Sequence, residues 1–482
     1  MTSRTFDAVV IGGGPGGYVA AIRLAQLGMR TALVEKDALG GACLHWGCIP
    51  SKALVAATNL VDDSRAAMRR GVVGEPQCAQ QCTDEIDLRK LREFKDAAVQ
   101  KLVGGVRMLE KRNGVKVLRG RARFVSPRAV EVEAAGDRAR VEAQAFVVAT
   151  GARPLAPPGF AFGEPGVWSA REALELREIP RHLVVLGGGA IGLELGTAYA
   201  KLGSKLTVIE ALPTILPGVD PAAARLVARG LRRRKATLLV GARATGLERR
   251  GAELGVRVEV GGGEQVVACD KVLVAVGFRP NSDDLGLEAA GVKVGREGFV
   301  EVDPWMQTSV PGIYSIGDVA GPPLLAHKAS REAEIAADAI AGRTARRWLA
   351  MPKAIFTDPE IATVGLSEGE ATAKGYDPVV GKFAFAALGR ALVLDRAEGF
   401  VKVVADRGSK LLLGAAVAGA EASNLVAQAT LALEMGATLE DVARTVHAHP
   451  TLAEAFMEAC KAALGIAIRS LNRTSRHGRN GA

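Results

Sequence analysis

One short pattern occurs twice in this chain, and it restricts the fold more than any other feature. Residues 7–17 (DAVVIGGGPGG) and 183–192 (LVVLGGGAIG) each read as an apolar strand that runs into a glycine-rich turn. A helical segment and a second strand follow each turn, and these strands end at Glu35 and Glu210, in both cases 23 residues after the first glycine. The glycines of the two Gly-x-Gly-x-x-Gly motifs are Gly12, Gly14, Gly17, Gly187, Gly189 and Gly192. One such motif is weak, but its context and its duplication predict two dinucleotide-binding units.

The residue types explain why this pattern suits a dinucleotide. The first glycine permits a tight turn, the second lets a pyrophosphate approach the backbone, and the third lets helix pack on strand. The helix N-terminus offers free N–H groups to phosphate, and the terminal acid accepts hydrogen bonds from ribose. Two units indicate two dinucleotides, and a bound flavin with a nicotinamide carrier is one such pair. Glu210 would repel a 2′-phosphate, and the following ALPTIL holds no Arg, so NAD is predicted rather than NADP.

A second unusual segment, LGGACLHWGCIPSKAL at residues 39–54, places Cys43 and Cys48 five residues apart. Zinc ligands are usually about two to four residues apart and come in two pairs, and thioredoxin-like pairs are CxxC. A regular helix rises ~7.5 Å over five residues, which exceeds the ~6.8 Å Cα separation that a disulfide tolerates. A bond between these cysteines would therefore need an irregular helix start, and two buried structural cysteines are the alternative. The residues suited to such a start are Gly40, Gly41, Gly47 and Pro50.

Length and composition set the broad class. The 482 residues suggest about three or four domains, and alternating strands and helices predict α/β architecture. No apolar run reaches the ~18 residues of a membrane span, and the N-terminus has no signal-peptide layout. Six cysteines do not make a disulfide scaffold, so a reducing cytoplasm is predicted.

The net charge of +10 is partly local. The tail, residues 466–482, carries Arg469, Arg473, Arg476 and Arg479 and no acid, and is interpreted as a flexible, solvated end rather than a docking arm. The run ARGLRRRK (228–235) predicts an amphipathic helix with one wet face. Since no nucleic-acid-binding motif accompanies these charges, neither nucleic acid nor a membrane is an expected partner.

Taken together, the motifs resemble the pyridine nucleotide–disulfide oxidoreductase family, and within it the branch that oxidises dihydrolipoamide. The cysteine segment resembles the family's redox-active signature, although His45 and Trp46 depart from it and are interpreted as packing residues. The segments VVATGARP (147–154) and IYSIGDVAG (313–321) resemble flavin-domain motifs, and HAHPTLAEA (447–455) resembles the His-Pro motif of the dimerisation domain. The resemblance covers residues 6–465.

The resemblance implies a catalytic cycle. His449, charged and oriented by Glu454, takes a proton from a dihydrolipoamide thiol. The thiolate attacks a Cys43–Cys48 disulfide at Cys43, and Cys48 passes electrons to FAD, which reduces NAD⁺. Lys52 is expected beside the flavin, paired with Glu194. The residues implied to bind FAD are Gly12, Gly14, Gly17, Glu35, Lys52, Ala122, Thr150, Gly151, Asp318 and Ala326. Those implied to bind NAD are Gly187, Gly189, Gly192, Glu210 and Gly277; no metal site is expected.

The implied architecture is α/β, with two Rossmann-like dinucleotide-binding domains and an α+β C-terminal dimerisation domain. The predicted domains are an FAD domain (1–150), an NAD domain (151–281), a central segment completing the FAD side (282–350), an interface domain (351–465) and the tail (466–482). A homodimer follows by resemblance, because His449 then reaches the disulfide of the other subunit. The implied partner is a lipoyl domain of an acyltransferase, or a lipoyl carrier protein, in 2-oxoacid dehydrogenase complexes.

Two other functions stay open. The first is an NADPH-dependent disulfide or metal reductase of the same family, against which Glu210 argues. The second is a non-catalytic flavoprotein that serves as an assembly subunit. An insertion at 75–87 carries Cys78 and Cys82, whose spacing of four suits a helical face or a weak metal site; a chance pair is the simpler interpretation.

Overall fold

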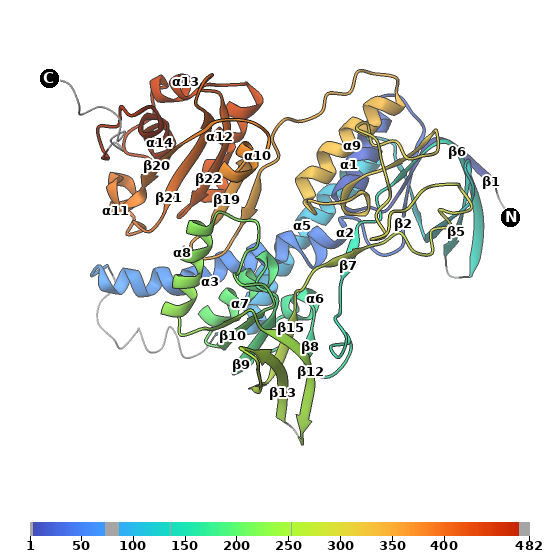
Figure 1. The fold of residues 1–482 in the computed structure, drawn as a ribbon. Helices are drawn as coiled ribbons and strands as arrows, with labels where there is room; N and C mark the ends of the chain where they lie inside the picture. The colour runs from blue at the N-terminus through green and yellow to red at the C-terminus, as the bar shows by residue number, and fades with distance from the viewer. Residues whose placement is uncertain (1–2, 73–85, 135, 252, 472–482) are drawn as a thin grey trace. The chain divides into compact units, whose positions relative to one another are not determined.

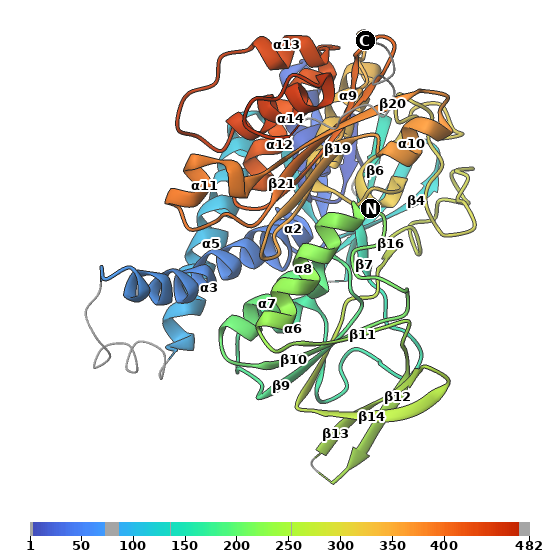
Figure 2. The same cartoon turned by 60° about the vertical axis from the view of Figure 1, so that its left-hand side comes forward.

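A computed structural model describes residues 3–72, 86–134, 136–251 and 253–471 (Figures 1 and 2). Its contacts divide the chain into two compact units. Unit 1 comprises residues 1–180 and 270–347, and unit 2 comprises residues 181–269 and 348–482. The finer domain boundaries predicted from the sequence stay predictions. Cys78 and Cys82 of the expected insertion, and the tail beyond residue 471, lie outside the described residues.

Unit 1 is built on a seven-stranded sheet of order β3-β2-β1-β6-β5-β4, with β17 also paired to β6. The pairs β3–β2, β2–β1, β1–β6 and β6–β17 are parallel. The pairs β4–β5 and β5–β6 are antiparallel and form a meander. The strands are β1 (Ser3–Ile11), β2 (Thr31–Glu35), β3 (Lys116–Arg119), β4 (Arg121–Ser126), β5 (Ala129–Ala134), β6 (Asp137–Val148) and β17 (Ile313–Ser315). Their inward side chains, among them Val9, Phe124 and Phe146, form the core.

Helices and short strands complete unit 1. The helices α1 and α9 pack against each other, and α5 packs on both α3 and α1. The helices are α1 (Pro15–Gln26), α2 (Gly41–His45), α3 (Cys48–Arg69), α5 (Leu88–Arg112), α6 (Ala170–Leu174), η1 (Gly317–Ala320) and α9 (Ala326–Ile340). Two short strand pairs are β7 (Ala152–Pro154) with β16 (Phe278–Pro280), and β8 (Val167–Trp168) with β15 (Lys271–Val274).

Unit 2 contains the second glycine motif and the C-terminal sheet. A parallel layer of β11-β10-β9 carries α7 and α8, and an antiparallel sheet β12-β13-β14 follows it in the chain. These elements are β9 (His182–Leu186), α7 (Ala190–Lys201), β10 (Lys205–Glu210), α8 (Pro221–Arg233), β11 (Thr237–Val240), β12 (Arg243–Arg250), β13 (Glu253–Val260) and β14 (Gly263–Cys269).

The C-terminal part of unit 2 is an antiparallel sheet of order β18-β19-β22-β21-β20 with helices packed on it. Val403, Val417 and Phe456 belong to its core. Its elements are β18 (Lys353–Ile355), β19 (Ile361–Gly365), α10 (Glu368–Ala373), β20 (Pro378–Ala384), η2 (Phe385–Ala387), α11 (Gly389–Val393), β21 (Phe400–Asp406), β22 (Leu412–Ala418), α12 (Ala422–Glu434), α13 (Leu439–Arg444) and α14 (Glu454–Leu464). The predicted fold class is therefore confirmed.

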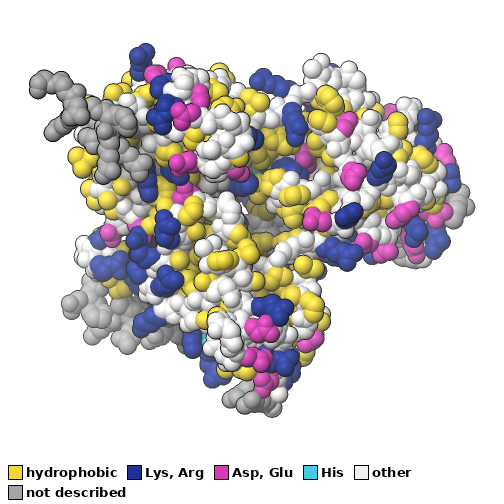
Figure 3. All heavy atoms as spheres, in the orientation of Figure 1, with side chains coloured by type: hydrophobic (Ala, Val, Ile, Leu, Met, Phe, Trp, Pro, Cys, Tyr) yellow, Lys and Arg dark blue, Asp and Glu magenta, His cyan; other side chains and the backbone are white. Residues whose placement is uncertain are grey.

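The basic run at 228–235 closes α8, as predicted. Val227 and Leu231 are buried on one face, and Arg229 and Arg233 on the other pair with Glu398. Figure 3 shows Lys and Arg side chains gathered on the face of the molecule over this helix. In the described part of the chain, no helix has the length and apolar character to span a membrane.

Candidate active site

The first glycine turn, Gly12–Gly17, joins β1 to α1. Gly12 has φ of +104°, and a Cβ there would lie 2.4 Å from the carbonyl oxygen of Ala149. A Cβ on Gly17 would lie 1.8 Å from the Gly12 carbonyl oxygen, so only glycine lets the helix start against the turn. Gly14 caps α1 without a side-chain hydrogen bond and has open space at its own Cβ position. The turn thus forms a cradle in which the N–H groups at the helix start have no partner within the helix, which suits a pyrophosphate.

Glu35 closes this cradle at the end of β2. Its carboxylate accepts hydrogen bonds from the N–H groups of Gly13 at 2.6 Å and Asp37 at 2.7 Å. A carboxylate has about four acceptor sites, so capacity is left for ribose hydroxyls. The N–H of Gly120 donates to the Glu35 carbonyl at 3.0 Å, and this brings the start of β4, which contains the buried Ala122, to the same edge.

Cys43 and Cys48 form a disulfide with a Cα–Cα distance of 4.6 Å. Cys43 lies in α2, and Cys48 is the first residue of α3, so the chain breaks between two helices where an irregular start was predicted. Gly40 and Gly41 both have positive φ, and a Cβ on Gly47 would lie 2.9 Å from the Ala42 carbonyl oxygen. These glycines let the chain fold back on itself.

The disulfide segment lies directly on the first glycine turn. The N–H of Gly40 donates to the Gly13 carbonyl at 2.8 Å, and a Cβ on Gly41 would lie 2.7 Å from Cα of Gly14. The Nε2 atom of His45 lies 3.0 Å from the Leu39 carbonyl, which fits the interpretation of His45 as a packing residue. Unit 1 therefore places a reducible sulfur bridge next to a dinucleotide cradle.

A buried ion pair that the sequence analysis missed shapes the loop around Asp318. Lys328 and Glu332 of α9 pair at 2.9 Å, and the Gly317 N–H donates to Glu332 at 2.7 Å. The Nζ of Lys328 also donates to the Gly321 carbonyl at 3.0 Å. Burial raises the pKa of Asp318, an effect that Lys328 opposes and Glu332 reinforces. The only signal in the sequence was the i,i+4 spacing of Lys328 and Glu332 after Ala326, the first residue of α9.

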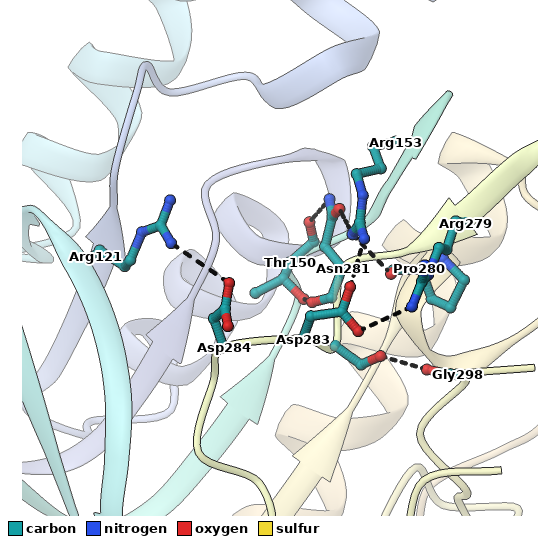
Figure 4. A network of polar contacts seen from close by, with 10 residues as sticks. Arg121, Thr150, Arg153, Arg279, Pro280, Asn281, Asp283, Asp284 and Gly298 are labelled. Carbon is teal, nitrogen blue, oxygen red and sulfur yellow. Dashed lines mark hydrogen bonds and ion pairs between the residues drawn. The ribbon is translucent and has the colours of Figure 1, made fainter. Parts of the chain in front are cut away.

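A polar network around Asn281 holds Thr150, one of the predicted flavin contacts (Figure 4), and reaches Gly151, another of them. Asn281 donates from Nδ2 to the Thr150 carbonyl and from its backbone N–H to the Gly151 carbonyl, both at 2.9 Å. The Thr150 hydroxyl returns a 2.7 Å hydrogen bond to the Asn281 carbonyl, and Arg153 donates to Oδ1 of Asn281 at 3.0 Å. Two segments 131 residues apart are thus tied together. Gly277, a predicted NAD contact, lies in the second segment of unit 1, residues 270–347. Its carbonyl accepts from the Leu155 N–H at 3.0 Å.

The second glycine turn, Gly187–Gly192, has the same construction in unit 2. Gly187 has φ of +100°, and Gly189 caps α7 without a side-chain hydrogen bond. The buried Glu210 accepts from the N–H groups of Gly188 at 2.6 Å and Leu212 at 2.8 Å. Glu194, on the same helix, accepts from the Phe356 N–H at 2.8 Å, while its pairing with Lys52 stays a prediction.

His449 and Glu454 lie together at the start of α14. The imidazole Nδ1 lies 3.0 Å and 3.2 Å from the two carboxylate oxygens, and the Thr451 N–H donates to Oε2 at 3.0 Å. Burial alone would raise the pKa of Glu454, but the hydrogen bonds from His449, Thr451 and Arg469 lower it to about 2. An ionised Glu454 can only accept, so Nδ1 carries the proton and Nε2 is the basic atom. The His449 side chain is 66% exposed, which leaves Nε2 open to a substrate.

Comparison with known proteins supports the same interpretation. Residues 6–333 match the family described as pyridine nucleotide-disulphide oxidoreductase, and residues 351–460 match its dimerisation domain. The chain belongs to the pyridine nucleotide-disulphide oxidoreductase family. It is an oxidoreductase with a Cys43–Cys48 disulfide, from a family of FAD-containing enzymes.

Individual members of the family extend the comparison. The chain is 49% identical to a dihydrolipoyl dehydrogenase from Thermus scotoductus, over 98% of this chain and 100% of the relative. The solved structure of LpdA from Mycobacterium tuberculosis matches with a TM-score of 0.86 and 29% identity, over 94% of this chain and 99% of that one. The HOCl-induced flavoprotein disulfide reductase RclA from Escherichia coli matches with a TM-score of 0.83 and 26% identity, over 95% and 99%.

Proposed function

We propose that this chain oxidises protein-bound dihydrolipoamide to lipoamide and that NAD⁺ accepts the electrons. The observation that supports this most is the disulfide between Cys43 and Cys48, seated against the first glycine turn at the start of α3. The identity of 49% to a dihydrolipoyl dehydrogenase, against 26% to a flavoprotein disulfide reductase, favours the dehydrogenase over a reductase.

The chain's own residues carry the thiol chemistry. Nε2 of His449 takes a proton from one substrate thiol, because Glu454 holds Nδ1–H and stabilises the resulting imidazolium. The thiolate attacks Cys43, the S–S bond to Cys48 breaks, and the second substrate sulfur then displaces Cys43. Lipoamide leaves with its disulfide closed, and the enzyme keeps a dithiol. The first turn of α3 favours Cys48 as a thiolate.

FAD, when bound, would supply the two-electron chemistry that links a dithiol to hydride transfer, which side chains alone do not provide. The first turn, Glu35, Thr150, Gly151 and Asp318 would hold FAD, because Gly12 and Gly17 leave no room for a side chain and the helix start at Gly14 can receive a phosphate. The second turn and Glu210 would hold NAD. One oxygen of Glu210 accepts from Gly188 in the turn and the other accepts from Leu212, so a 2′-phosphate would meet a carboxylate there.

The proposal also includes the oligomeric state, the partner protein and the cellular compartment. The dimerisation domain supports a homodimer, in which His449 serves the disulfide of the other subunit. The partner is the lipoyl domain of an acyltransferase or a lipoyl carrier protein, as in 2-oxoacid dehydrogenase complexes. A reducing cytoplasm suits a disulfide that cycles rather than one that only braces the fold.

Anaerobic titration of the purified protein with dihydrolipoamide tests the proposal. We expect long-wavelength thiolate-to-flavin absorbance after two electrons, and NADH oxidation well above NADPH oxidation with lipoamide as substrate. A preference for NADPH would favour the reductase, and absence of the absorbance would contradict the cysteine–flavin contact.

Matched cysteine variants separate the two sulfurs. Cys43→Ser should keep the long-wavelength absorbance without any reductant, since a Cys48 thiolate remains, whereas Cys48→Ser should lose it. Each should lower lipoamide turnover on the order of 10³-fold, because no disulfide can form. Unchanged turnover in Cys48→Ser would favour the non-catalytic alternative.

A further inference from the structure

Arg469 reaches the predicted base from a segment that the sequence analysis interpreted as a solvated tail. Gly465, with φ of +75°, ends α14 and turns the chain. The Arg469 guanidinium then donates to Oε1 of Glu454 at 2.8 Å, and Nδ1 of His449 lies 3.0 Å from the same oxygen. One carboxylate oxygen is therefore shared between the imidazole and a permanent cation.

The shared carboxylate is buried, whereas the two groups that contact it are exposed to solvent. The Glu454 side chain is 4% exposed, whereas those of His449 and Arg469 are 66% and 48% exposed. Glu458 lies one turn further along α14. Its charge favours the charged form of Arg469, and its carboxylate pairs with Lys461 at 3.3 Å.

The charged side chains of the elements packed against α14 have their own contacts. In α13, Asp441 accepts from Thr438 and lies near Arg444. In β20 and β21, Lys382 lies over the Phe400 ring and Lys402 pairs with Asp220. Of these charged groups, Arg469 is the one that pairs with Glu454 and so alters the charge beside His449. Glu458 in turn lies near Arg469.

We propose that Arg469 is a positioning residue for the His449 base: it holds Glu454 and withdraws part of its charge, which widens the pH range in which Nε2 is free to accept a proton. A carboxylate beside a histidine favours the imidazolium, and a cation on that carboxylate opposes this effect. This inference rests on the proposed function, because it assigns His449 the task of taking the thiol proton.

The test compares Arg469→Gln, which keeps a hydrogen-bond donor, with Arg469→Lys, which keeps the charge. In Arg469→Gln the acid limb of the pH profile of kcat/KM for dihydrolipoamide should move to higher pH by about half a unit, as expected for one partly solvated charge that shares a carboxylate oxygen with the imidazole. Arg469→Lys should restore the wild-type limb. On the alkaline side of this limb, kcat should change less than about twofold.

A second readout does not depend on turnover. The pH dependence of the long-wavelength absorbance of the two-electron-reduced protein should shift in the same direction in Arg469→Gln. Equal loss of kcat at every pH, with both limbs unmoved, would show that Arg469 only braces the fold and would overturn the inference. Failure of the proposed function is distinguishable, since the wild-type protein itself would then not oxidise dihydrolipoamide.

Discussion

The two glycine turns have the same backbone construction but are followed by different segments. In each, the acid at the end of the second strand, Glu35 or Glu210, accepts from the second glycine of the GGG run and from the N–H two residues later. Each turn leads into a helix of 12 residues capped by an extended glycine. The pair shows that one glycine-turn construction occurs in both units and that the turn itself contains no redox-active side chain.

The difference begins after the acid. In unit 1 the Gly13 carbonyl accepts from Gly40, and the chain goes straight into α2 and the disulfide. In unit 2 the matching Gly188 carbonyl accepts from Leu216, and the chain continues to α8, which Asp220 caps. The segment that packs on each turn, rather than the turn itself, therefore distinguishes the two units: only the first carries the disulfide.

The third glycine offers the largest test of the shared construction. Gly17→Ala would put a methyl group where the Gly12 carbonyl oxygen already lies within 1.8 Å, so we expect a loss of stability on the order of 3 kcal/mol or more and protein without flavin. Gly14→Ala is the control, because the nearest atom is Gly41 Cα at 4.0 Å. It should fold, with weaker flavin retention. Flavin-to-protein ratio and thermal unfolding measure both, and equal stability of the two variants would contradict the steric argument.

A second test uses a position where the two units differ inside the core. Glu110 of α5 and Leu231 of α8 occupy matching places, since their carbonyls accept from Val115 and Ala236, just before β3 and β11. Both side chains are 1% exposed, and neither carboxylate oxygen of Glu110 has a hydrogen-bond partner in the described part of the chain. Burial raises the pKa of Glu110 to about 8.

The sign of the pH effect follows from that shift. Between the ordinary pKa of Glu and about 8, the folded state binds the proton more tightly than the unfolded state, so Glu110 makes stability fall as pH rises. Glu110→Leu should remove this slope and stabilise the protein by about 4–5 kcal/mol at pH ~8.5, with a gain of under about 1 kcal/mol near pH ~5. Urea unfolding at the two pH values measures the difference. A gain that is independent of pH would mean that packing alone distinguishes leucine from glutamate.

The sequence predicted the features that depend on neighbouring residues and missed those that depend on contacts between distant segments of the chain. The turns, the two acids and the cysteine segment are short sequence patterns. They could be predicted because backbone sterics restrict certain turn positions to glycine and because strands have a regular apolar pattern. Asn281 on Thr150, and Lys328 on the loop of Asp318, depend on tertiary contacts that spacing does not encode. Arg469 was missed for a related reason: a basic tail is usually solvated, and only the turn at Gly465 returns it to Glu454.

The smallest expected effect concerns the two acids, and it tests the proposal that each turn binds a different cofactor. Glu35→Gln and Glu210→Gln each keep the side-chain shape but lose the charge and one acceptor, so each turn should persist while its grip on ribose weakens. We expect Glu210→Gln to raise the KM for NAD⁺ about tenfold and to narrow the preference over NADP⁺, with flavin content unchanged. Glu35→Gln should instead lower flavin retention about tenfold and leave the KM for NAD⁺ of the flavin-replete protein unchanged. If Glu210→Gln released flavin, or if Glu35→Gln altered coenzyme preference, the assignment of one dinucleotide to each turn would be wrong.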